Sequence, residues 1–187
     1  MSRKTKLLIG AFAVVVMLIS IWGTYKHISE NFVYHDENHI LVSTTGERMI
    51  APDFTVFDIE REETTLSEHL GKKTVVSFWA TWCTPCKLML SNFNKVYKEM
   101  GNDVEFMMIN LTDGMDETIE VASKHVKNSR LKVPVYYDLS YSAAHSYHVE
   151  TLPLTIFIDE NGYISNIHQG YLDKEQIEDY ISSISNI

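Results

Sequence analysis

The chain has 187 residues and a formal net charge of −9 at pH 7, and only two of its residues are cysteines. This length allows one folded domain with a sizeable apolar core once an N-terminal extension is set aside. The acidic balance argues against nucleic acid as a partner, because phosphate backbones bind clusters of Lys and Arg.

The first 25 residues predict a membrane anchor. Three cations lie in a basic leader, residues 1–6, and an uncharged apolar run follows over residues 7–25, which is about long enough to cross a bilayer. The run has no convincing small-x-small cleavage site, so we expect an uncleaved single-pass anchor. The positive-inside tendency places the leader in the cytoplasm and everything after the anchor outside it. The chain beyond the leader carries 13 basic and 25 acidic residues, a charge of −12.

Residues 26–50 mix charged, histidine and short apolar pieces, with a turn signal at residues 44–46. We expect a stalk or an N-terminal hairpin here.

Regular elements start at residue 51, so we place the folded domain at residues 51–187. Short apolar runs predict strands at residues 54–57, 74–80, 104–110, 133–137, 154–158 and 163–167. The last two read as an antiparallel pair joined by a tight turn at residues 159–162.

Helical spacing and end signals predict the helices. Apolar residues recur at helical spacing after Pro85, which is tolerated in a first turn, and Gly101 supplies a stop. Asp173 with Gln176 three residues later resembles a capping box. Further helices are expected at residues 117–128 and 141–148. The element order is βαβ, αβ, then ββα, which describes an α/β domain.

The two cysteines, Cys83 and Cys86, carry the clearest chemical signal. A disulfide that closes so short a loop would constrain the unfolded chain little, so a purely structural staple is a poor explanation. A structural zinc site needs four ligands, and the chain has no second cysteine pair. Two histidine pairs, His35 with His39 and His145 with His148, read as ordinary polar residues, so no metal is expected.

A CxxC pair at the start of a helix suits thiol-disulfide exchange. Cys83, at the helix tip, receives the partial positive charge of the helix end, which favours its thiolate and makes it the expected attacking nucleophile. Cys86 lies one turn inside and is expected to resolve the mixed disulfide. The Cys83–Cys86 disulfide is then the redox group, and no separate cofactor is expected.

The run at residues 75–87, VVSFWATWCTPCK, resembles the active-site segment of thioredoxin-like proteins. The order and spacing of further segments are similar to the extracytoplasmic TlpA/ResA group over residues 51–185; these segments lie at residues 51–54, 66–67, 71–72 and 151–162. The resemblance implies a thioredoxin fold, with a central mixed β-sheet flanked by helices and an N-terminal β extension, preceded by a transmembrane anchor helix.

The resemblance also implies a substrate groove. Pro153 matches the cis-proline that faces the cysteines in this superfamily, and the backbone beside Leu152 would pair with an extended segment of the partner. Trp82 would form an apolar wall beside the nucleophile. Thr84 and Pro85, between the cysteines, would complete the groove.

Two departures from the pattern concern proton transfer. Ser77 stands where cytoplasmic thioredoxins usually carry a buried aspartate. Asp113 falls near the position where the ResA-like group carries an acidic residue, which makes it a candidate for managing the proton of Cys86. The alternative reading of Asp113 is an ordinary loop or cap aspartate.

The residues between the cysteines favour a reductase. Thr84 and Pro85 lack the histidine of strong oxidants, and a proline before the second cysteine resembles reducing thioredoxins. The resemblance implies a membrane electron donor of the CcdA or DsbD type and a protein disulfide as substrate, such as that of apocytochrome c.

Three alternatives stay open: a thiol oxidase or isomerase, a thiol peroxidase, and a non-enzymatic copper chaperone of the Sco type. The peroxidase is kept because residues 51–54 and 66–67 also resemble the opening of peroxiredoxins. The Sco group spaces its cysteines by three residues instead of two.

Overall fold

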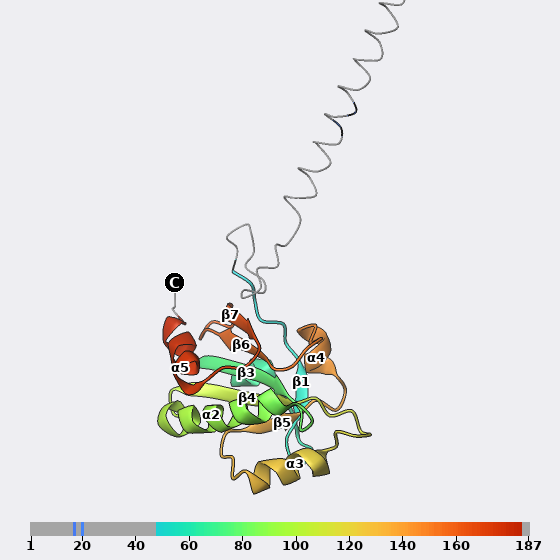
Figure 1. Ribbon diagram of the computed structural model, residues 1–187. Helices are drawn as coiled ribbons and strands as arrows, with labels where there is room; N and C mark the ends of the chain where they lie inside the picture. The colour runs from blue at the N-terminus through green and yellow to red at the C-terminus, as the bar shows by residue number, and fades with distance from the viewer. Residues whose placement is uncertain (1–16, 18–19, 21–47, 185–187) are drawn as a thin grey trace, which may run out of the picture. The chain divides into compact units, whose positions relative to one another are not determined.

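The computed structural model describes residues 17, 20 and 48–184 (Figure 1). The predicted leader, the anchor apart from residues 17 and 20, and the stalk or hairpin up to residue 47 lie outside the described residues. Within the described part of the chain, no helix has the length and apolar character needed to span a bilayer. The N-terminal boundaries therefore stay predictions.

Seven strands form one mixed sheet, in the order β2-β1-β5-β4-β3-β6-β7. The three central strands β3, β4 and β5 are parallel, and the outer strands pair in antiparallel fashion. The strands span β1 Thr55–Phe57, β2 Glu63–Thr65, β3 Lys73–Trp79, β4 Val104–Asn110, β5 Val135–Tyr137, β6 Leu154–Ile158 and β7 Ile164–Gln169. The mixed sheet with flanking helices confirms the predicted thioredoxin-like α/β fold (Figure 1).

Strand β3 shows why the central strands were predictable. It lies between β4 and β6, and all of its residues after Lys73 are buried. A strand covered on both faces reads as a continuous apolar run, which is what the sequence has there. Strand β2 was not predicted, because its residues Glu63–Thr65 are polar and partly exposed. It forms through pairing with β1, with Thr55 opposite Thr65.

Helices cover both faces of the sheet. The long helix after the cysteines, α2, packs with α5 and α3 on one face, while α4 and the short 3-10 helix η1 lie on the other. The helices span α2 Thr84–Met100, α3 Ile119–Asn128, α4 Ser142–Ser146, α5 Lys174–Ser183 and η1 Leu66–His69. The capping box predicted at Asp173 and Gln176 is present at the start of α5.

The start of α3 and the C-cap of α2 show how the helix ends are fixed. Helix α3 begins at Ile119 instead of residue 117, because the side chain of Thr118 accepts a hydrogen bond from the Val121 amide and so caps the helix. This leaves Glu117 outside the helix. Gly101 ends α2 as predicted, but with an ordinary φ of −66°. Glycine is needed there because a Cβ atom would lie 2.5 Å from the Tyr97 carbonyl oxygen.

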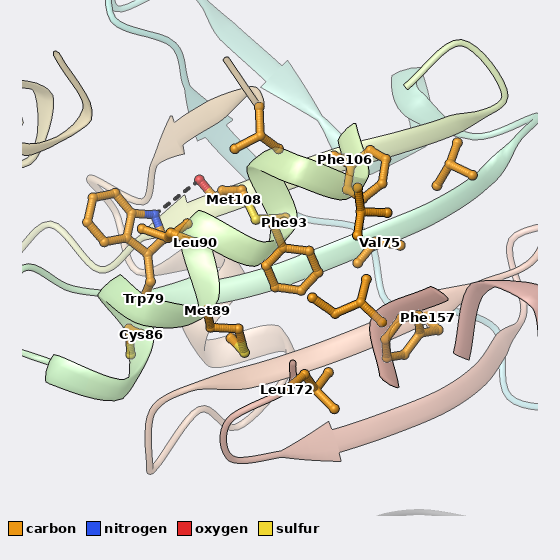
Figure 2. Packing of buried hydrophobic residues seen from close by; sticks show 14 of the residues in the cluster. Val75, Trp79, Cys86, Met89, Leu90, Phe93, Phe106, Met108, Phe157 and Leu172 are labelled. Atoms are coloured by element: carbon orange, nitrogen blue, oxygen red, sulfur yellow. Dashed lines mark hydrogen bonds between the residues drawn. The ribbon is translucent and has the colours of Figure 1, made fainter. Parts of the chain in front are cut away.

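The larger apolar cluster joins the α2 face of the sheet to the cysteines (Figure 2). Cys86 and Met89 of α2 pack near Trp79 of β3, whose indole Nε1 donates to the Met108 carbonyl at 3.4 Å. Both cysteines belong to this cluster. The N-terminal half of α2 is therefore held in place by its packing against the core of the domain.

Candidate active site

Cys83 and Cys86 form a disulfide at the start of α2, with their Cα atoms 5.3 Å apart. Cys83 is the N-cap residue, and its sulfur accepts a hydrogen bond from the Cys86 amide at 3.2 Å. Pro85 lies in the first turn, where its missing N–H is not needed by the helix. Cys83 is 5% exposed and Cys86 is fully buried. The order in which Cys83 attacks and Cys86 resolves stays a prediction.

The position of Cys83 also provides its electrostatic environment. The first amides of a helix have no partners within the helix, and they give its N-terminal end a partial positive charge. A reduced Cys83 at this cap is therefore favoured as a thiolate, the form that attacks disulfides.

The surface beside the disulfide is apolar and exposed. Trp82 is 64% exposed, and Thr84 and Pro85 are exposed as well. Leu88, one turn into α2, is 60% exposed. Large apolar side chains at the surface are typical of contact sites for other molecules. Their roles in a substrate groove stay predictions.

The Leu152–Pro153 peptide bond is cis, as the resemblance implied. Pro153 is buried, and its carbonyl accepts a hydrogen bond from the Gly170 amide at 2.9 Å. Leu152 is partly buried and packs against the apolar cluster that contains both cysteines. The structure therefore brings Leu152 and the cysteine pair onto one packed cluster.

Ser77 replaces the buried aspartate of cytoplasmic thioredoxins with a neutral pair. Its hydroxyl lies 3.0 Å from that of Thr155, directly opposite on β6, and both side chains are buried. The two hydroxyls share one hydrogen bond, and this position offers no carboxylate to Cys86.

Asp113 organises the loop that follows β4. Its Oδ1 accepts hydrogen bonds from the amides of Met115 at 2.7 Å and Glu117 at 2.9 Å. These bonds, with the Glu117 amide first, lower the pKa of Asp113 below its ordinary value. The geometry is that of a loop-capping carboxylate. A role in managing the Cys86 proton stays a prediction.

The structure places a second carboxylate, that of Glu117, next to the active-site turn. Glu117 is fully buried. Its Oε1 accepts from the Thr81 amide at 2.8 Å and from Asn110 Nδ2 at 2.6 Å, and its Oε2 accepts from the Thr81 hydroxyl at 2.5 Å. Glu117 was not predicted as a site residue, because in the sequence it reads as the first residue of a helix. The only signal was Thr118, a residue type that favours the N-cap position; a helix capped by Thr118 begins at residue 119 and does not include Glu117.

His125 of α3 packs beside Trp79 of β3. Its ring centroid is 5.9 Å from that of the Trp79 ring. Burial first, and then the charge of Lys87, lower the pKa of His125.

Within the described residues, no three His, Cys, Asp or Glu side chains gather in a way that could hold a metal ion.

Comparison with known proteins agrees with this geometry. Residues 48–167 match the AhpC/TSA family. The chain is 30% identical to the thiol-disulfide oxidoreductase ResA of Geobacillus kaustophilus, over 98% of this chain and 99% of the relative. It is 34% identical to ResA of Bacillus thuringiensis subsp. konkukian, over 98% and 99%.

Two solved structures show the same fold. StoA from Bacillus subtilis is 26% identical, with a TM-score of 0.61 over 70% of this chain and 97% of StoA. A thiol:disulfide interchange protein DsbE from Chlorobium tepidum is also 26% identical, with a TM-score of 0.65 over 73% and 96%. The chain therefore belongs to the AhpC/TSA family and is a thiol-disulfide oxidoreductase of the type that includes ResA, StoA and DsbE.

Proposed function

We propose that this oxidoreductase reduces protein disulfides outside the cytoplasm, held at the membrane by residues 7–25. The observation that carries the proposal is the Cys83–Cys86 disulfide at the tip of α2, with the exposed Trp82 beside it. A deeply buried partner thiol and an outer thiol at a helix cap provide the two steps of exchange.

The catalytic cycle needs no group beyond the two cysteines. The Cys83 thiolate attacks one sulfur of the substrate disulfide, forms a mixed disulfide, and the second substrate sulfur leaves as a thiolate that takes a proton. Cys86 then loses its proton, attacks the Cys83 sulfur, and releases the first substrate sulfur as a thiol. The substrate gains two electrons and two protons, and the enzyme returns to the disulfide.

A new cycle requires a thiol donor that reduces Cys83–Cys86. We propose a membrane protein of the CcdA or DsbD type, because a domain anchored outside the cytoplasm has no access to cytoplasmic reductants. A protein substrate such as apocytochrome c, whose cysteines must be reduced before haem attachment, fits the proposed direction.

The equilibrium reduction potential of the Cys83–Cys86 pair tests the direction. Measured against glutathione, we expect a value near that of thioredoxin, about −270 mV. A value near that of the strong oxidant DsbA, about −120 mV, would contradict a reductase and favour a thiol oxidase. An intermediate value with efficient reshuffling of a scrambled substrate would favour an isomerase and equally contradict the proposal.

A thiol peroxidase is the second candidate, because the family match begins at residue 48 and includes the segment that resembles peroxiredoxins. Hydrogen peroxide turnover by the purified protein with excess dithiothreitol separates the two. The reductase proposal expects no turnover above that of a Cys83→Ser, Cys86→Ser control, whereas turnover that depends on Cys83 would favour the peroxidase.

A further inference from the structure

The buried carboxylate of Glu117 lies directly beneath the turn that presents Cys83. The turn is tied to it twice, through the amide and the hydroxyl of Thr81. Asn110, the last residue of β4, donates the third hydrogen bond and connects the carboxylate to the sheet. A side chain so fully enclosed is costly to keep unless its polar atoms are bonded, and here both oxygens are.

The arrangement suits the carboxylate anion. All three hydrogen bonds are ones that Glu117 accepts, from an amide N–H, a hydroxyl and a side-chain NH₂ group. Hydrogen bonds to a charged acceptor are stronger than those between neutral groups, so the network holds its partners firmly.

The network lies close to the reacting sulfur. Thr81 precedes Cys83 by two residues, which limits the separation of their Cα atoms to about 7 Å. Further backbone bonds fix the same turn: the Cys83 amide donates to the Ala80 carbonyl at 3.2 Å, and the Leu111 amide donates to the Trp79 carbonyl at 3.0 Å. The loop that holds Glu117 and the turn that holds Cys83 therefore form one bonded unit.

We propose that Glu117 is a positioning residue that fixes the Cys83 turn and whose negative charge makes the Cys83–Cys86 pair more reducing. This deepens the proposed function, since it names a cause for the reducing direction. Reduction of the disulfide takes two electrons and yields two thiols, of which Cys83 ionises above its pKa. A neighbouring buried anion repels that thiolate and so disfavours the reduced form, while the neutral disulfide is unaffected.

The expected order of magnitude follows from Coulomb's law. A unit charge about 10 Å away, at the effective dielectric constant of about 20 that describes protein sites, changes an ionisation equilibrium on the order of tenfold. For a two-electron couple, a tenfold change in the equilibrium constant corresponds to about 30 mV.

Other ionisable groups face the same region. They are Lys87 on α2, His125 on α3, Asp113 in the loop and Asp138 after β5, whose amide donates to the Asn110 carbonyl. All of them are common to the wild-type chain and a Glu117 variant. A difference between the two chains therefore reports the charge of Glu117.

The test compares Glu117→Gln with the wild-type chain by equilibration with glutathione at pH 7 and pH 9. Glutamine has the same shape: its oxygen can accept from the Thr81 amide and from Asn110, and its NH₂ group can donate to the Thr81 hydroxyl. The substitution therefore removes mainly the charge. We expect a shift towards a more oxidising pair, about tenfold or about 30 mV at pH 9. At pH 7 the shift should be smaller, because more of Cys83 is protonated in both chains.

The matched control is Glu120→Gln, which removes the same charge from an exposed position in the first turn of α3. It should leave the potential unchanged at both pH values. An equal shift in the two variants would contradict the proposal, as would a Glu117→Gln shift that is zero or independent of pH. A wild-type potential near that of DsbA would overturn the reductase direction but leave the charge effect of Glu117 testable by the same difference.

Thr81→Val separates position from charge. It removes one hydrogen bond to Glu117 but keeps the carboxylate, so the potential should stay at the wild-type value while the rate of exchange with a protein disulfide falls several-fold. A potential shift as large as that of Glu117→Gln would contradict the electrostatic part. An exchange rate of Thr81→Val equal to that of wild type would contradict the positioning role of Glu117. This test holds even if Glu117→Gln does not fold.

Discussion

Access to the reacting sulfur is decided by a few residues around Cys83. The cysteine is only 5% exposed, so a substrate disulfide must approach closely, and the broad exposed surface next to it belongs to Trp82. Aromatic side chains in such positions contribute much contact area with little loss of rotamer freedom.

Trp82→Ala should therefore weaken the binding of protein substrates more than the chemistry. We expect KM for a protein disulfide to rise about three- to tenfold, equivalent to about 1 kcal/mol of contact energy, with kcat within about twofold of wild type. Ile59→Ala, which removes an exposed apolar side chain after β1, is the control. Equal KM changes in the two variants, or none in Trp82→Ala, would remove Trp82 from the contact surface.

Asp113 should stabilise the fold in a way that depends on pH. Backbone amides of Glu117 and Met115 favour its anion, so its pKa in the folded chain lies below the ordinary 3.8. Its stabilising contribution is then fully present above pH 3.8 and is lost as the pH falls through the folded pKa. Unfolding measured from pH 7 down to pH 2 should show Asp113→Asn less stable than wild type at neutral pH and equal to it in acid. A difference that stays constant over this range would contradict the capping role.

The same variant tests the proton-management hypothesis. If Asp113 shuttles the Cys86 proton, the pH profile of Cys86 alkylation in the reduced protein shifts in Asp113→Asn. An unchanged profile removes Asp113 from the mechanism.

The sequence predicted some site residues and not others for a physical reason. Cys83 and Cys86 are adjacent along the chain and chemically distinctive, so local pattern is enough to find them. Pro153 could be singled out only by resemblance, because any one X-Pro bond is a priori trans. Glu117 contacts Thr81, 36 residues away, through a fold that the sequence pattern does not show.

Among the elements, the pairing of β3 with β6 brings Ser77 next to Thr155. Ser77 is the residue at the position where cytoplasmic thioredoxins usually carry a buried aspartate. Ser77 and Thr155 are directly opposite in register, and their buried hydroxyls share one hydrogen bond. A buried hydroxyl that loses its partner retains the full cost of its desolvation.

A double-mutant cycle measures this pair. Thr155→Val should lower the free energy of unfolding by about 1–2 kcal/mol, because the Ser77 hydroxyl is left without its partner. Adding Ser77→Ala should recover part of that loss, so that the two substitutions are coupled by about 0.5–1 kcal/mol. Urea unfolding of the four chains gives the coupling, and strict additivity would contradict a direct hydrogen bond.

Elements with strong local signals were predicted to within a residue or two. Strands β4 and β6 have the predicted boundaries, since apolar runs bounded by polar turns leave few alternatives. The exceptions depend on partners elsewhere in the chain. Strand β2 exists through its pairing with β1, and the Ser67 amide of η1 donates to the Asp53 carboxylate at 3.0 Å.

In the molecule as a whole, residues 48 and 49 contact β7, at one edge of the sheet, and the turn before it. The Ile164 amide donates to the Met49 carbonyl at 2.8 Å, and the Arg48 guanidinium pairs with Asp159 and lies 4.2 Å from the centroid of the Tyr163 ring. Residues 48–50 therefore lie beside the β6–β7 turn.

The central claim for the whole molecule is an ordered exchange in which Cys83 attacks and Cys86 resolves. The most direct measurement is the trapping of a protein disulfide substrate by the single-cysteine variants, with the linkage mapped by mass spectrometry. Cys86→Ala should accumulate a stable mixed disulfide through Cys83, while Cys83→Ala, whose remaining thiol is buried, should trap little. Equal trapping by both variants, or trapping through Cys86 alone, would contradict the account.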